Sequence, residues 1–251
     1  DNGSREPATA ALLALLQRDA RVRVLPQPGP FNYAALNNRA AAVARGTVLL
    51  LFNNDVEPSS PGWLAAMVAH AMQPDVGAVG AKLLYGDGRV QHGGVVLGPD
   101  AAMTHIHRLA AGDDPGYLGQ LASARSVAAV TGACLAIRRQ VFLEAGGLDE
   151  TGLKIGFNDV DLCLRLGDLG YRNVWTPRAV LLHHESASRG SDESGEARAR
   201  NAAEQALMRA RWGRLLDEDP QHNPNLRFHW HGFDLPSAPR RPRPWRAFLQ
   251  C

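Results

Sequence analysis

The sequence predicts an α/β fold, and two neighbouring segments carry that prediction. An apolar run over residues 47–52 stops abruptly at Asn53-Asn54-Asp55, as expected for a strand buried on both faces of a sheet. A helical pattern follows from Pro61, with Trp63 and Met67 on one face. Because a buried strand followed by a helix is the repeating unit of α/β proteins, we expect a sheet flanked by helices, with polar chemistry at the strand ends.

The remaining elements follow from periodicity and from turn residues. Helices are expected at residues 9–17, 37–44, 139–145, 158–169 and 196–212. Strands are expected at residues 21–25, 76–84, 89–97, 127–137, 171–175 and 179–182. Residues 98–126 are rich in Gly, Pro and Asp and lack a clear period, which predicts a long surface loop. We therefore expect one domain over residues 1–213 and a Pro- and Arg-rich tail over residues 214–251.

Composition excludes several classes of function. The chain has 251 residues, 45% of them hydrophobic, which is enough for a substantial core. Its 27 Lys and Arg residues barely outnumber its 25 Asp and Glu residues, so no nucleic-acid partner is expected. Its three cysteines form no C-x-x-C pair, and no apolar run reaches the roughly 18–20 residues of a membrane span. The cysteine spacing predicts a cytoplasmic location, and the lack of a membrane span predicts a soluble chain.

The strand end at Asn53-Asn54-Asp55 is the first candidate site. Open α/β sheets bind ligands at the carboxyl ends of their strands. A carboxylate there can hold Mg²⁺ or Mn²⁺ against a diphosphate, since these ions prefer oxygen ligands. The alternative is a plain turn, because Asn and Asp favour turns.

A second candidate site opens the helix predicted at residues 158–169. Asn158 and Asp161 have the spacing of a capping box, and Asp161 can also pair with Arg165 one turn later. Both residues therefore have a structural explanation. Asp159 has none, and it lies in the first helical turn, where the helix dipole favours an ionised carboxylate. An ionised carboxylate can accept a proton, so Asp159 is a candidate general base.

His183 and His184 form the third candidate site, directly after the strand predicted at residues 179–182. Neighbouring side chains on a strand point to opposite faces, so at most one of the two imidazoles is expected to reach a given metal ion. A histidine without other ligands nearby in sequence more often has a structural role.

Several short motifs occur in the same order and with similar spacing as in a known protein family. They are Asp1-Asn2-Gly3-Ser4, 29–33, 51–55, Gln91-His92-Gly93-Gly94, 131–134, 157–161 and 183–190. Together they resemble glycosyltransferase family 2, the inverting enzymes of the GT-A fold, and within it bacterial polysaccharide and O-antigen transferases, including rhamnosyltransferase-like members. The resemblance implies a mixed, mostly parallel sheet flanked by helices. It also implies transfer of a sugar from a nucleotide-diphosphate donor to a hydroxyl of a glycan or lipid-linked glycan.

The resemblance implies a role for each matched residue. The residues implied to bind the donor are Asp1, Asn53, Asp55, Thr131, Gly132 and Ala133. The implied ligands of a Mn²⁺ or Mg²⁺ ion are Asp55 and His183, with His184 as the alternate, and Asp159 matches the general base. The residues implied on the acceptor side are Asn158, Asp161 and Cys134. The sequence departs from the family pattern at Asn53, where an acid is usual, and at Asn158, where Glu is usual.

Two further expectations concern the ends of the chain. The family's domain normally opens with a strand and a helix before the motif matched by Asp1 to Ser4, so we expect a fold that lacks its first strand and helix and a chain that is weak or inactive alone. Near the other end, basic residues flank an aromatic ring and could contact the inner face of a membrane, unless they form a solvated tail. They are Arg240, Arg241, Arg243 and Arg246, beside Trp245.

Two other classes of function compete with the transferase. The first is a noncatalytic remnant of such an enzyme that still binds a nucleotide sugar or carbohydrate. The second is a metal phosphohydrolase, which would require a denser cluster of carboxylates than the sequence indicates. P-loop, dinucleotide-binding, nucleophile-elbow and zincin motifs are absent from the sequence, so those classes are excluded.

Overall fold

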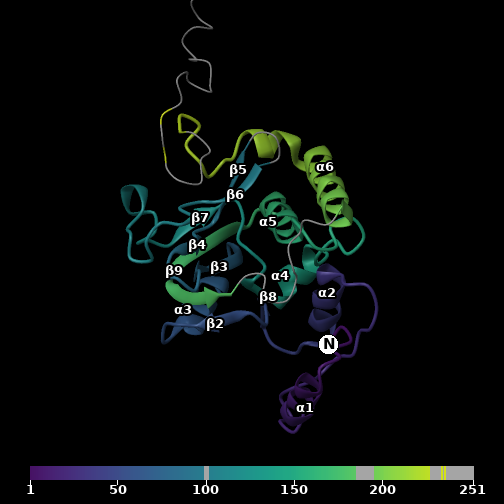
Figure 1. Ribbon diagram of the computed structural model, residues 1–251. Helices are drawn as coiled ribbons and strands as arrows, with labels where there is room; N and C mark the ends of the chain where they lie inside the picture. The colour runs from purple at the N-terminus through teal and green to yellow at the C-terminus, as the bar shows by residue number, and fades with distance from the viewer. Residues whose placement is uncertain (99–101, 185–194, 227–232, 234, 236–251) are drawn as a thin grey trace, which may run out of the picture.

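A computed structural model of the chain describes residues 1–98, 102–184, 195–226, 233 and 235 (Figure 1). The helices are α1 (Pro7–Leu16), α2 (Tyr33–Val43), α3 (Trp63–Ala71), α4 (Arg139–Glu144), α5 (Asn158–Asp168) and α6 (Gly195–Asp217), with a 3₁₀ turn, η2, at Tyr117–Gly119. The strands are β1 (Val48–Phe52), β2 (Val56–Pro58), β3 (Val76–Leu84), β4 (Val90–His92), β5 (Val95–Gly98), β6 (Ala102–His105), β7 (Arg125–Val127), β8 (Cys134–Arg138) and β9 (Arg172–His183).

A mixed sheet forms the centre of the fold. Within the described residues it has seven strands, in the order β1-β8-β3-β9-β2, with β4 added to β3 and β7 added to β9. Strands β1, β3 and β9 run in the same direction, and β8 runs in the opposite direction between β1 and β3. The sheet is mixed as predicted, but it is not mostly parallel. Because β8 is inserted in reverse and the short strands pair antiparallel, β3–β9 is the parallel pair among those described.

Both faces of the sheet are covered, which confirms the α/β class. Side chains alternate along a strand, so Leu135 and Ile137 of β8 pack on one face, with the core that includes α5. Ala136 of β8 packs on the other face, where Met67 of α3 completes a second apolar cluster. Figure 1 shows α3 and α5 on opposite sides of β3. The strands are thereby held rigidly, and their ends can carry a site.

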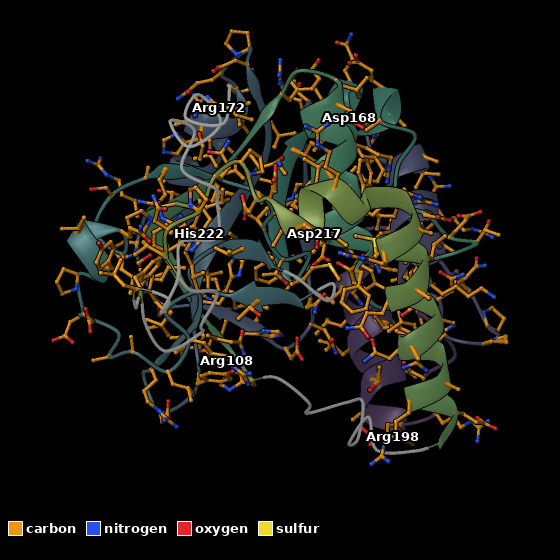
Figure 2. All side chains as sticks on the ribbon, turned by 90° about the horizontal axis from the view of Figure 1, so that it is seen from above. Arg108, Asp168, Arg172, Arg198, Asp217 and His222 are labelled. Carbon is orange, nitrogen blue, oxygen red and sulfur yellow. The ribbon has the colours of Figure 1, made fainter. Side chains whose placement is uncertain are left out.

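The C-terminal helix α6 belongs to the same core. Figure 2 shows it running along one side of the molecule, from Arg198 near its start to Asp217 at its end. Its Leu216 is fully buried, and after the helix the buried carboxylate of Asp219 accepts a 2.8 Å hydrogen bond from the amide of Leu97. The predicted boundary between residues 213 and 214 therefore falls inside a helix that packs on the domain. The predicted tail beyond residue 226 lies outside the described residues, apart from Phe233 and Leu235.

Several predicted elements differ from the structure. The strand predicted at residues 89–97 is two strands, β4 and β5, which belong to different sheets, and the strand predicted at residues 127–137 is regular only from Cys134. Residues 21–25 form no strand. The predicted loop at residues 98–126 contains β6, η2 and the start of β7, because β6 pairs with β5 in a separate two-stranded sheet. The two strands predicted over residues 171–182 are one continuous strand, β9. Strand formation depends on pairing with neighbouring strands, and that pairing is invisible in local composition.

The described parts of the chain contain no helix that is long and apolar enough to cross a membrane. Either membrane contact or a solvated tail was expected for the basic residues between Arg240 and Arg246. These residues lie outside the described residues.

Candidate functional site

The edge between β2 and β9 brings Asp55 and His183 together. Val56 of β2 pairs with His183 of β9, and the amide of His184 donates a 2.9 Å hydrogen bond to the carbonyl of Asp55. This pairing places the Nε2 atom of His183 3.2 Å from the Oδ1 atom of Asp55, with 13% and 14% of the two side chains exposed. Two residues 128 positions apart in sequence thus meet at one strand end, as the transferase interpretation requires.

The other ring nitrogen of His183 is held by Gln91. Its Nδ1 lies 2.6 Å from the Oε1 atom of Gln91, and the Nε2 amide of Gln91 lies 3.4 Å from the main-chain carbonyl of His183. Meanwhile the Oδ1 atom of Asp55 is buried and accepts no hydrogen bond from any described residue. A buried carboxylate oxygen without a donor is costly, so this edge is suited to a positively charged ligand.

The pair fits a divalent cation by its atoms and by its spacing. Octahedral bonds of about 2.1 Å at right angles place two ligand atoms about 3 Å apart, close to the 3.2 Å between Asp55 Oδ1 and His183 Nε2. The described residues contain no cluster of three or more His, Cys, Asp or Glu side chains able to hold a metal. Among the described residues the protein ligands would be Asp55 and His183, and Mg²⁺ usually takes further ligands from substrate and water.

His184, the alternate ligand, faces elsewhere. Its ring is 46% exposed, and its Nε2 atom lies 3.3 Å from a carboxylate oxygen of Glu57. The alternation of side chains along a strand sends the two imidazoles to different partners. The geometry favours His183 over His184 at Asp55.

The turn at residues 131–134 links the strand end to the start of α5. The amide of Gly132 donates a 2.7 Å hydrogen bond to the Oδ2 atom of Asp159, and the next carbonyl, that of Ala133, accepts a 2.9 Å bond from the amide of Asn53. On the other side, the amide of Thr131 lies 3.4 Å from the Nε2 atom of His92. Consecutive residues of one turn thus hold the segments that carry Asn53 and Asp159.

A glycine is needed at position 132 because the chain approaches Tyr33 closely. A Cβ atom there would lie 2.9 Å from the Tyr33 hydroxyl and 3.4 Å from the Cβ atom of Asp159. That hydroxyl donates a 2.8 Å hydrogen bond to the Gly132 carbonyl, which fixes the turn against α2.

Asp159 lies in the first turn of α5 and is half-buried. Its Oδ2 atom accepts the Gly132 amide and its Oδ1 atom accepts the amide of Val160, at 2.7 and 2.8 Å. A carboxylate has about four acceptor sites, so each oxygen keeps capacity for a further donor such as a hydroxyl. Asp159 is thus held in place and remains partly exposed, which suits a general base.

The three residues assigned to the acceptor side lie in the interior, which corrects that assignment. Asp161 is 0% exposed, and its carboxylate is bonded by side chains of α5 and α6. The side chain of Asn158 is buried and donates to the carbonyl of Ile155, so the expected capping box with Asp161 does not form. Cys134 is fully buried against the sulfur of Met67, and burial raises the pKa of its thiol to about 12.

Asp1 lies with the N-terminal segment beside α2 (Figure 1). Its exposed carboxylate accepts hydrogen bonds from the amide and hydroxyl of Ser4, at 3.0 and 2.5 Å. The next residue, Asn2, donates to the carbonyl of Gln27 at 2.6 Å. These bonds order the segment locally, and its role in binding a donor stays a prediction.

Sequence reasoning assigned no role to three residues that support the site. They are Tyr33, Gln91 and His92. All three belong to segments that carried the family resemblance, and this was the available signal. What each one touches depends on strand pairing, which the local sequence does not reveal.

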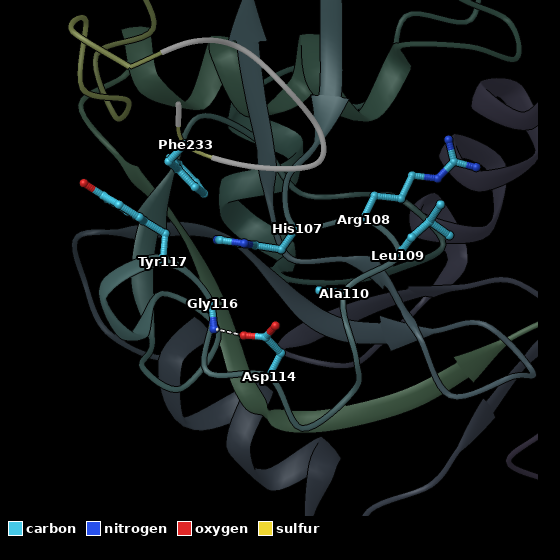
Figure 3. A pocket seen from close by; sticks show the side chains of 8 residues that line it. All are labelled: His107, Arg108, Leu109, Ala110, Asp114, Gly116, Tyr117 and Phe233. Carbon is cyan, nitrogen blue, oxygen red and sulfur yellow. Dashed lines mark hydrogen bonds between the residues drawn. The ribbon is translucent and has the colours of Figure 1, made fainter. Parts of the chain in front are cut away.

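A pocket of about 390 Å³ lies elsewhere, over the segment before and after Asp114 (Figure 3). It is lined by His107, Arg108, Leu109, Ala110, Asp114, Gly116, Tyr117 and Phe233. Asp114 holds the loop by accepting a 2.7 Å hydrogen bond from the amide of Gly116, and the rings of Tyr117 and Phe233 stack 4.8 Å apart. None of the predicted site residues lines this pocket.

The amino-acid sequence of the chain matches a known family of proteins. The profile of "Glycosyl transferase family 2" matches residues 1–145. The chain is 48% identical over 241 residues to the uncharacterized protein y4gI of Sinorhizobium fredii, and 42% identical over 228 residues to the O-antigen biosynthesis protein RfbC of Myxococcus xanthus. These matches cover 96% and 90% of the chain but 26% and 17% of the two relatives, so the chain spans about a quarter or less of their length.

A third relative is matched over more of its own length. The chain is 31% identical over 219 residues to the N-acetylglucosaminyl-diphospho-decaprenol L-rhamnosyltransferase of Mycobacterium tuberculosis, covering 76% of the chain and 67% of that protein.

Solved structures of GT-A glycosyltransferases share the fold. A mannosyltransferase from Pyrobaculum calidifontis in complex with GDP-Man and Mn²⁺ matches with a TM-score of 0.56 at 16% identity, covering 84% of this chain and 53% of that one. GalNAc-T7 with UDP, GalNAc and Mn²⁺ matches with a TM-score of 0.59 at 16% identity, covering 76% and 38%. The GT-A fold expected from the sequence is confirmed.

Proposed function

The chain belongs to glycosyl transferase family 2, and from this premise we propose that its residues form the catalytic machinery of an inverting glycosyltransferase. The enzyme moves a sugar from a nucleotide-diphosphate donor to an acceptor hydroxyl during synthesis of a bacterial cell-surface polysaccharide. The observation that carries this proposal is the meeting of Asp55 and His183 at one strand end, 3.2 Å apart, with a carboxylate oxygen otherwise without a donor.

Asp55 and His183 are the residues that would hold a Mn²⁺ or Mg²⁺ ion. When bound, such an ion supplies charge neutralisation for the departing nucleoside diphosphate. The turn of Thr131, Gly132 and Ala133 supports the donor side, because it is bonded to the strand end at Asn53. Asn53 offers a neutral amide oxygen at the position where the family usually has an acid.

Asp159 acts as the general base. It accepts the proton of the acceptor hydroxyl while that oxygen forms a bond to the anomeric carbon and the bond from that carbon to the diphosphate oxygen breaks. The electron pair of the broken bond leaves with the nucleoside diphosphate, and a single displacement inverts the anomeric configuration. The Gly132 amide supports the role by keeping the carboxylate directed to the turn, since it binds Oδ2 at 2.7 Å.

The functions named for two relatives support the class of acceptor. One relative is an O-antigen biosynthesis protein, and another is a rhamnosyltransferase named for a diphospho-decaprenol substrate. We place the acceptor in the class of glycans or lipid-linked glycans, with the enzyme working in the cytoplasm at the inner face of the membrane.

Replacing Asp159 by Asn tests the proposal. The amide keeps the size of the side chain but cannot take up the proton, so turnover should fall by about 10²–10⁴-fold. Nucleotide release would be measured on the 251-residue chain with a panel of nucleotide sugars and Mn²⁺, together with donor affinity by calorimetry, which should stay within a few-fold. Asp168→Asn is the matched control, because Asp168 is exposed at the other end of the same helix.

The same experiment separates the transferase from a noncatalytic remnant. Asn53 and Asn158 stand where the family usually has acids, and this departure is the observation that favours a remnant. If the wild-type chain, supplied with the first strand and helix that the family's domain normally has, binds nucleoside diphosphate with Mn²⁺ but releases no nucleotide from any donor, the remnant is the correct function.

A further inference from the structure

The residue Gln91 has no assigned role, yet it contacts His183 twice. It lies on β4, is 5% exposed and is therefore fixed by the surrounding sheet. Its Oε1 atom lies 2.6 Å from the Nδ1 atom of His183, and its amide nitrogen lies 3.4 Å from the main-chain carbonyl of the same residue. A single side chain thus contacts both the ring and the backbone of the proposed metal ligand.

The two contacts favour one position of the proton on the His183 ring. Only the amide nitrogen of Gln91 can donate to a carbonyl, so it is the oxygen that faces the imidazole. An acceptor facing Nδ1 requires a hydrogen on Nδ1. In the neutral ring the lone pair then resides on Nε2, the atom 3.2 Å from Asp55 Oδ1.

In the neutral ring with its proton on Nδ1, two acceptor atoms face each other at this edge. The lone pair of His183 Nε2 and the carboxylate oxygen of Asp55 repel unless a positive charge lies between them. The Asp55 oxygen receives no hydrogen bond from the described residues. Partners on the non-ligating nitrogen are known to orient metal-binding histidines and to fix their tautomer.

We infer that Gln91 is a positioning residue: it keeps the proton on Nδ1 of His183 and presents Nε2, with Asp55 Oδ1, as two preformed ligand atoms for a divalent cation. The inference rests on the proposed function, because the ion is the one assigned there. The proposed role of Gln91 is exerted through its contacts with His183.

The wild-type protein tests the tautomer without any variant. Long-range ¹H–¹⁵N NMR spectra of ¹⁵N-histidine-labelled, metal-free chain distinguish a protonated Nδ1 from a protonated Nε2, and the His183 signals are identified by their loss in His183→Asn. We expect the His183 ring to carry its proton on Nδ1 and its lone pair on Nε2. A neutral His183 with its proton on Nε2 would overturn the inference.

The variant Gln91→Met tests the consequence for metal binding, because Met keeps the length of the side chain but cannot accept the Nδ1 proton. We expect the Mn²⁺ dissociation constant, measured by calorimetry, to rise about 10–100-fold, and the Nδ1–H tautomer to lose its dominance. Gln120→Met is the matched control, since Gln120 Oε1 makes the same kind of contact, 3.2 Å, to His107 Nε2. It should leave Mn²⁺ affinity within about twofold.

The outcomes separate the two proposals. Suppose that the wild-type chain binds no Mn²⁺, that His183 nevertheless carries its proton on Nδ1, and that Gln91→Met abolishes this preference. The metal assignment then fails, while the positioning role of Gln91 stands. If the wild-type chain binds Mn²⁺ and Gln91→Met binds it equally tightly, the positioning role is wrong and the metal site is correct.

Discussion

Two buried or nearly buried aspartates show how differently the same side chain is used. Asp161, between α5 and α6, is 0% exposed, and both of its oxygens are occupied. Its donors are Arg165 at 2.8 Å, Arg211 at 2.7 Å and Trp212 at 2.9 Å. Asp55, at the edge between β2 and β9, is 14% exposed and keeps an oxygen that accepts no hydrogen bond from the described residues. A buried carboxylate with both oxygens bonded stabilises the fold, whereas one with an oxygen that accepts no hydrogen bond is suited to bind a ligand.

The network around Asp161 also extends beyond this residue. Arg165 donates to the carbonyls of Ala145 and Gly147, and Arg211 bonds to Asp149 at 2.9 Å. The buried carboxylate therefore joins α6 to α5 and to the segment after α4. The aspartate two positions after the proposed base thus has a structural role in holding these helices together.

The largest effect expected from this contrast is on stability at Asp161. Asp161→Ala leaves two guanidinium groups and an indole without their shared acceptor, so the free energy of unfolding should fall by about 3–5 kcal/mol. Chemical denaturation followed by circular dichroism measures it. Asp168→Ala, on the same helix and exposed, should stay within about 0.5 kcal/mol. A loss under about 1 kcal/mol at Asp161 would contradict the structural role.

A smaller effect is expected at the turn that joins the two regions. In Gly132→Ala the new Cβ atom would lie 2.9 Å from the Tyr33 hydroxyl, so we expect a loss of about 1–3 kcal/mol from the strain. Removing that hydroxyl with Tyr33→Phe should reduce the cost of the alanine, and a double-mutant cycle measures the coupling. Gly167→Ala in α5 meets nothing within 4 Å and should be neutral or stabilising. Purely additive effects of Gly132→Ala and Tyr33→Phe would contradict the close approach.

The difference between these regions also decides what the sequence could predict. Asp55 and His183 each follow an apolar run, and the end of a buried strand is recognisable without coordinates. The interior position of Asp161 was not predictable, because its partners Arg211 and Trp212 come from a helix 50 positions later. The reversed strand β8 was missed for the same reason, since its direction depends on neighbours from distant parts of the chain.

The smallest effect is on the pH dependence of stability, through His92 behind the turn. Burial, together with the charges around it, holds the pKa of His92 well below its usual value in the folded protein. The unfolded chain therefore takes up a proton near pH 6.5 that the folded chain does not, so stability is full above that pH and declines as pH falls below it. Thermal melts between pH 8 and pH 5 should show this decline. His92→Gln should flatten it in part, because burial also lowers the pKa of His107. An unchanged profile in His92→Gln would contradict the contribution of His92.

The central claim is that Asp55 and His183 hold one divalent cation, and Mn²⁺ titration by calorimetry in the presence of a nucleoside diphosphate tests it most directly. Asp55→Asn and His183→Asn should each weaken Mn²⁺ binding at least about tenfold while unfolding free energy changes by less than about 1 kcal/mol. His184→Asn, which alters the neighbouring exposed imidazole, should bind Mn²⁺ like the wild type. Unchanged Mn²⁺ affinity in Asp55→Asn or His183→Asn would contradict the account.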